Sequence, residues 1–138
     1  MSRLVLEIVT PTGIALRKDV DYVVVPTVDG PIGILPGHIR LMTKLTTGVL
    51  RYKLDDQDHF MAVSEGFMEV TPHKVNVLAE AADLPENIDA EQALADKREA
   101  EEAMHRSLNE KMNFTQAALN LERALAKLQV AKKYGDTK

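Results

Sequence analysis

Apolar and polar residues alternate over short stretches in the first half of the chain. Val49–Leu54, Phe67–Val70 and Lys74–Val77 each follow this two-residue period, which is typical of a strand with one buried face. Turn residues separate the stretches, as in Pro11–Gly13 and Asp29–Pro31. Short strands with a turn signal about every 8 to 12 residues predict an antiparallel β-sandwich.

The second half follows a different pattern. From Asp89 to Lys133 the chain contains neither Gly nor Pro, and strong helix formers dominate. Asp89 and Gln92 resemble a capping box at a helix start, and Asn113 with Gln116 repeats this signal after a break in the pattern. The sequence therefore predicts two helices.

Each predicted helix has one narrow apolar stripe at helical spacing. The stripes are Ala93, Ala100, Met104 and Leu108 on the first helix, and Phe114, Ala118, Leu121, Leu125 and Leu128 on the second. Two such helices pack on each other as an antiparallel hairpin and keep little apolar surface for the sandwich. We therefore expect an α+β chain, with a β-sandwich domain over residues 1–86 and a weakly anchored helical hairpin over residues 87–138.

Charge separates the two predicted helices. Residues 87–111 carry seven acidic and four basic side chains, a net charge of −3, whereas residues 112–138 carry two acidic and five basic ones, a net charge of +3. Opposite charges favour a closed hairpin by a modest, salt-sensitive amount. The second helix is also a cationic rod that fits an acidic surface elsewhere. We therefore expect two hairpin states of similar free energy.

Composition excludes several function classes. The net charge of −4 argues against nucleic-acid binding. The chain has no Cys, and its four His residues are scattered, so no metal site is expected. No apolar stretch approaches the roughly 20 residues that cross a bilayer, so direct membrane insertion is not expected. Ser64 lies outside a nucleophile elbow and there is no P-loop, so we expect no catalytic residues.

Several stretches resemble a known family. Asp29–His38, which contains Gly-Ile-Leu-Pro-Gly-His, is similar to the signature of the F-type ATP synthase epsilon subunit, as are Thr46–Arg51 and Ser64–Val70. The resemblance extends over nearly the whole chain. It implies a sandwich of roughly ten strands followed by two helices, in a rotor subunit that performs no chemistry itself. An unrelated β-domain interaction module is the alternative, but it leaves the Gly-Ile-Leu-Pro-Gly-His cluster unexplained.

The resemblance also implies partners. The sandwich is expected to join the gamma subunit and rest on the ring of c subunits. The helices, when extended toward the beta (and alpha) subunits, are expected to inhibit ATP hydrolysis. The location implied is peripheral, on the cytoplasmic face of a bacterial plasma membrane. The stromal face of a plastid thylakoid is the alternative, because the sequence carries no transit segment.

Two sets of residues are expected to meet these partners. The interface with the c ring and gamma is expected at Pro31, Ile32, Gly33, Ile34, Pro36, Gly37 and His38. Functional contacts concentrate on loops held by rigid scaffolds, although such a loop also simply reverses the chain. Arg123 and Lys127 lie four residues apart on one helix face. The resemblance implies that they contact an acidic segment of the beta subunit, whereas the residues alone also fit a solvated helix face.

A nucleotide is the one cofactor to consider. Some family members bind ATP through an Ile/Leu-Asp-x-x-Arg-Ala motif, which closes the hairpin and makes it an ATP sensor. Ile88, Asp89 and Ala93 match this motif, but Gln92 stands in place of the Arg and offers no charged contact. Arg98 lies close enough to compensate, and a helix cap explains Asp89 and Gln92 equally well. We therefore expect weak ATP binding at most.

Overall fold

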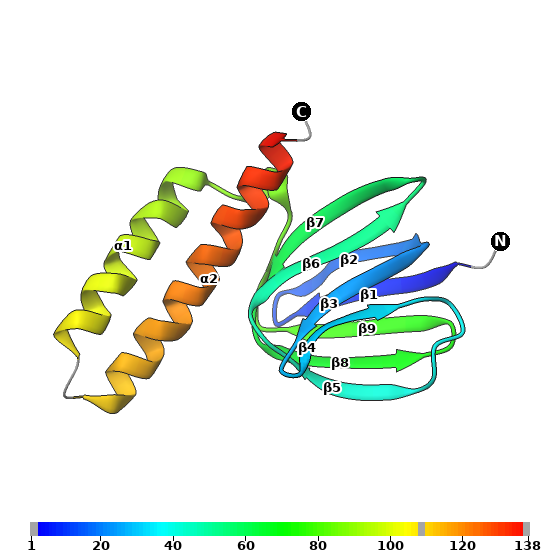
Figure 1. Ribbon diagram of the computed structural model, residues 1–138, viewed down its shortest axis with the longest axis horizontal. Coiled ribbons are helices and arrows are strands. Elements are labelled where there is room, and N and C mark those ends of the chain that lie inside the picture. The colour runs from blue at the N-terminus through cyan, green and yellow to red at the C-terminus, as the bar shows by residue number, and fades with distance from the viewer. Residues whose placement is uncertain (1–2, 108–109, 137–138) are drawn as a thin grey trace.

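The computed structural model describes residues 3–107 and 110–136 of the chain. A β-sandwich lies beside two antiparallel helices (Figure 1), as the predicted α+β fold class requires. The strands are β1 (Leu4–Thr10), β2 (Gly13–Val20), β3 (Tyr22–Thr27), β4 (Gly30–Ile34), β5 (Leu41–Leu45), β6 (Gly48–Leu54), β7 (Gln57–Val63), β8 (Gly66–Thr71), β9 (Lys74–Ala79) and β10 (Ala82–Asp83). A short 3₁₀ turn, η1 (Pro85–Asn87), leads to α1 (Ala90–Arg106) and α2 (Lys111–Asp136).

The strands form one folded sheet in the order β10-β7-β6-β3-β5-β8-β9-β1-β2, with β4 paired to β3. Neighbouring strands run antiparallel except β1 and β9, which pair in parallel from Val5 beside Lys74 to Val9 beside Leu78. Such a pair needs a long connection, which the strands between β1 and β9 provide. The predicted antiparallel sandwich therefore contains one parallel pair.

The core follows from the period-two pattern. Leu4, Leu6 and Ile8 of β1 are fully buried, and so are Leu50 of β6 and Met61 of β7, and all of them belong to one apolar cluster. Alternate residues of each strand point away from this cluster. The sandwich therefore has its own core, independent of the helices.

The start of α1 agrees with the sequence, whereas the start of α2 does not. The Asp89 side chain accepts hydrogen bonds from the backbone N–H groups of Glu91 (3.0 Å) and Gln92 (3.1 Å), which makes it the expected cap. The second helix begins before Asn113, because the Phe114 N–H already donates to the Glu110 carbonyl at 3.0 Å. Asn113 is therefore a helical residue and not the cap.

The two helices meet through small side chains. Ala93 and Ala100 of α1 are buried, as are Ala117 and Ala124 of α2. Leu125 is 44% exposed and Leu121 and Leu128 are only half-buried, so the predicted leucine seam is not the buried centre of the hairpin. Alanines allow the helices to approach closely, which moves the contact line away from the leucines. Leu108, also expected in the core, lies outside the described residues.

A second small cluster attaches α2 to the sandwich. Ala126 and Val130 of α2 are buried with Ala62 of β7. Three partly buried apolar residues surround them, namely Val49, Phe60 and Ile88. We call these six residues the docking cluster. The expectation that little apolar surface would reach the sandwich is therefore only partly right: the contact exists, but its fully buried members are small.

Candidate functional site

The stretch with the family signature is partly strand and partly loop. Gly30–Ile34 forms β4, which pairs with β3. Pro31 and Gly33 are exposed and Ile32 is half-buried, but Ile34 is fully buried in the sandwich core. Ile34 is therefore a core residue, which corrects its place in the predicted interface.

The rest of this stretch connects β4 to β5 at the end of the sandwich away from the helices (Figure 1). Gly37 adopts φ 86°, and its N–H donates to the Pro72 carbonyl at 2.8 Å, which fixes the loop to the β8–β9 turn. The His38 ring nitrogen Nδ1 lies 2.7 Å from the Ile39 carbonyl oxygen. Pro36 and His38 are both half-buried. The loop is therefore held in one shape by backbone contacts.

Two apolar residues of this loop were not predicted as interface residues. Leu35 is 62% exposed and Ile39 is 78% exposed. The sequence holds no clear signal for Leu35, because the glycines and prolines around it indicate a loop, and loop side chains do not alternate between two faces. We call Leu35–Ile39 the apical loop. It presents two large apolar side chains that the folded chain leaves uncovered.

A second apolar surface, also missed from the sequence, lies on the outer face of the sheet. Val9 of β1 stands in register between Ile14 of β2 and Leu78 of β9, and Leu78 stands opposite Phe67 of β8. Ile14, Leu78 and Phe67 are each more than half exposed. We call these four residues the outer-face row. Four adjacent apolar side chains across four strands are typical of a partner surface.

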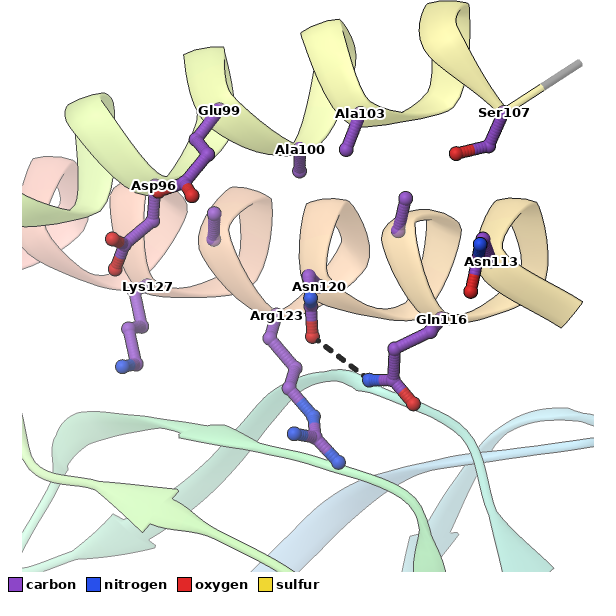
Figure 2. A pocket seen from close by; sticks show the side chains of 12 residues that line it. Asp96, Glu99, Ala100, Ala103, Ser107, Asn113, Gln116, Asn120, Arg123 and Lys127 are labelled. Atoms are coloured by element: carbon purple, nitrogen blue, oxygen red, sulfur yellow. Dashed lines mark hydrogen bonds between the residues drawn. The ribbon is translucent and has the colours of Figure 1, made fainter.

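Two of the basic residues of α2, Arg123 and Lys127, point toward the sandwich. Arg123 Nη2 contacts Glu65 Oε1, and Lys127 Nζ lies 3.9 Å from Asp83 Oδ2. Figure 2 shows both side chains leaving α2 on the side of the strands. Among the ion pairs of the described side chains, none joins α1 to α2. The expected charge attraction between the helices is therefore replaced by attraction between α2 and the sandwich.

Glu65 is well held as a charged acceptor. Thr47 Oγ1 donates to its Oε2 at 3.1 Å, while Arg123 occupies Oε1. Burial alone would raise the pKa of Glu65, but the hydrogen bond and charge of Arg123, a backbone hydrogen bond and the Thr47 hydroxyl together outweigh burial and hold this pKa below its usual range. The pair is ionised at neutral pH.

The residues of the ATP motif do not converge on one cavity. Ile88 belongs to the docking cluster, Asp89 caps α1, and Ala93 is buried. Gln92 Nε2 donates to Asp96 Oδ1 at 2.9 Å, and Arg98 is exposed. Each motif residue therefore has a structural role or faces solvent.

A groove of about 500 Å³ does run between α1 and α2 (Figure 2). Asp96 and Glu99 line it from α1, and Arg123 and Lys127 line it from α2. The motif residues Ile88–Ala93 do not line this groove, and neither does Arg98. Two carboxylates beside the cations make it a poor match for a polyanion.

Two further observations concern the described residues. Residues 3–107 and 110–136 bring together no group of three or more His, Cys, Asp or Glu side chains able to hold a metal ion. In the same ranges, no helix has the length and apolar character needed to cross a membrane.

The geometry defines a class of protein: a β-sandwich with two exposed apolar surfaces and a helical hairpin docked on it through α2, an arrangement that suits a protein acting by binding partners. Residues 3–85 match the β-sandwich domain of the ATP synthase Delta/Epsilon chain, and residues 86–132 match its long α-helix domain. The chain belongs to the ATP synthase delta/epsilon chain family, as a non-catalytic accessory subunit.

Individual relatives agree with this assignment. The chain is 45% identical to the ATP synthase epsilon chain of Halalkalibacterium halodurans over 95% of its own length and 98% of the relative. It is 42% identical to that of Nitratidesulfovibrio vulgaris strain DP4, over 91% of this chain and 92% of the relative. A chain in the Euglena gracilis mitochondrial ATP synthase structure, OSCP/F1/c-ring, shares the fold with a TM-score of 0.80 at 21% identity, over 96% of this chain and 82% of that one.

Proposed function

We propose that this chain couples the gamma subunit to the c ring and restrains ATP hydrolysis through its two helices. The sandwich would turn with the rotor, and the hairpin would leave it to reach the beta and alpha subunits. The complex would lie on the cytoplasmic face of a bacterial plasma membrane.

The observation that carries the proposal is that the partner surfaces and the hairpin are independent. The outer-face row and the apical loop stay exposed while α2 is docked on the sandwich. A rotor partner can therefore bind the sandwich in either state of the hairpin. We assign the apical loop, which includes Pro36 and His38, to the c ring together with the preceding Pro31–Gly33. We assign the outer-face row to gamma.

The inhibitory role is supported by how α2 is attached. Its docking cluster buries two alanines and one valine, so the apolar contribution is small for a 26-residue helix. Arg123 and Lys127 supply a cationic face that suits an acidic segment of the beta subunit once the hairpin opens.

An ATP sensor is the weaker alternative. Gln92 supplies no charge, Arg98 faces solvent, and the motif residues are spread between a helix cap and the docking cluster. The proposal therefore needs no nucleotide.

Co-purification tests the partner assignment. The tagged full-length chain is mixed with the purified gamma subunit in one experiment and with the detergent-solubilised c ring in another. The tagged chain is then recovered, and the partner that stays bound to it is measured. We expect both partners to be retained, with the L35S/I39S variant losing the c ring and the F67S/L78S variant losing gamma. Retention of neither partner by the unaltered chain would refute the proposal.

A further inference from the structure

We propose that Glu65 and Asp83 form an intramolecular latch that keeps the hairpin docked by occupying the two cations, Arg123 and Lys127, with which α2 would bind an acidic partner. The latch itself is a property of the isolated chain. Only its consequence in the complex rests on the proposed function.

The two latch carboxylates face two cations that lie one turn apart on α2. Arg123 and Lys127 are one helical turn apart and point to the same side. Glu65 lies just after β7, and Asp83 lies on β10, directly paired with β7. Two carboxylates on one platform thus face two cations on one helix.

That platform is rigid. The Ser64 N–H donates to the Ala81 carbonyl at 3.0 Å, and the Ala81 N–H donates to Ser64 Oγ at 2.6 Å. The Glu80 N–H donates to the Glu65 carbonyl at 3.0 Å. The next residue, Gly66, packs so closely on β9 that a Cβ there would collide with the Leu78 carbonyl. The carboxylates are therefore positioned before α2 arrives, which limits the ordering cost of the contact.

Apolar packing does not seal this interface. A cleft of about 130 Å³ separates α2 from the sandwich, lined by Ala62, Ala126 and the latch residues Asp83, Arg123 and Lys127. Because only small residues are fully buried, the apolar contribution to docking is limited and the two ionic contacts add to it. Because each latch side chain is about one-third exposed, salt and solvent can weaken these contacts.

The contact is also exchangeable. Arg123 reaches Glu65 through Nη2, while its Nε is buried without a hydrogen-bond partner in the described part of the chain. A guanidinium that contacts a carboxylate through one nitrogen forms a weaker pair than one that makes a bidentate contact. Pairing with Glu65 neutralises much of the charge that Arg123 would offer to an outside carboxylate. Docking of the hairpin and binding of an acidic partner would therefore compete for this side chain.

Distance measurements on the full chain test the latch. Because the chain has no Cys, spin labels can be attached to K44C on β5 and Q129C on α2. We expect one short distance for the otherwise unaltered chain at low salt. Charge reversal by E65K, or by R123E, should lower the ratio of docked to undocked chains by about tenfold, because attraction becomes repulsion.

The charge-swapped E65K/R123E variant is the decisive control, since it should recover most of the docked population even if a single variant is poorly folded. E69K, on the outer face of β8, and K132E, on the exposed side of α2, make matched charge changes and should leave the distance unchanged. The D83K/K127E swap should behave like the first swap. The latch is refuted if E65K leaves the short distance intact, or if the double variant stays undocked. Neither result depends on whether the complex is inhibited.

Discussion

Glu65, between β7 and β8, accepts a hydrogen bond from Arg123 of α2, 58 residues further along the chain. This contact joins the sandwich, which carries the exposed partner surfaces, to the helix that would leave it. The Glu65 carboxylate therefore connects the part of the chain proposed to bind the rotor with the part proposed to restrain hydrolysis. Its ionisation can be tested by pH, and the residues around it by substitution.

Acidification should undock α2. The pKa of Glu65 is lowered in the docked state, so its contribution to docking is fully present above the ordinary carboxyl range, near pH 4.3, and is lost as pH falls through the lowered value. Arg123 is the cation that pairs with Glu65, and Asp83 and Lys127 form the neighbouring pair. The spin-label distance should lengthen as the pH falls below the ordinary carboxyl range, and E65Q should remove most of this dependence. A pH-independent distance from pH 7 to 3 would contradict the assignment.

Neighbouring residues of the signature should respond in opposite ways. Ile34→Ala removes a fully buried side chain from the sandwich core and should lower the free energy of unfolding by about 2–4 kcal/mol. Leu35→Ala changes an exposed side chain and should alter stability by less than about 0.5 kcal/mol while weakening c-ring binding. Urea unfolding and c-ring pull-down distinguish the two. Equal loss of stability for both variants would place Leu35 in the core.

The outer-face row should matter for binding and not for folding. The F67S/L78S variant removes two side chains that are more than half exposed, so its urea midpoint should change little. Its affinity for gamma should fall by about tenfold or more, because apolar anchors dominate such interfaces. Leu94→Ser on α1 is the control, since it alters another exposed leucine outside the row. Full gamma affinity in F67S/L78S would exclude the row as the gamma surface.

ATP should bind weakly or not at all. Loss of the charged contact at Gln92 is worth about 1.5–3 kcal/mol, and Gln92 is already hydrogen-bonded to Asp96. Titration calorimetry on the isolated chain should therefore give no affinity in the micromolar range. Gln92→Arg should improve binding only slightly, because the other motif residues do not share a cavity with it. Micromolar affinity in the unaltered chain would make the ATP sensor the better interpretation.

Features set by near neighbours in the sequence were predictable. The alternation at Lys74–Val77 gave a strand, and Asp89 capped α1, because each depends on residues only a few positions away. Ile34 was misassigned for the opposite reason: glycines and prolines around it indicated a loop, but pairing with β3 made it a core strand residue.

Long-range contacts were not predictable from local patterns. Net charge indicated that α2 would attract α1, yet the ion pairs form with Glu65 and Asp83. Likewise, leucines make up most of the apolar stripe predicted for α2. In the structure, Ala117 and Ala124 are the α2 residues buried between the helices, because small side chains let the helices approach closely. Recognising the outer-face row requires the pairing register of four strands. No single segment of the sequence indicates this register.

The ATP hydrolysis rate of the reconstituted F1 complex, measured with the full chain and with a chain cut after Asn87, tests the central claim most directly. The cut removes α1 and α2 and leaves every strand of the sandwich. We predict that the shortened chain stays in the complex and that hydrolysis rises. An unchanged rate with the shortened chain bound, or its loss from the complex, would contradict the account.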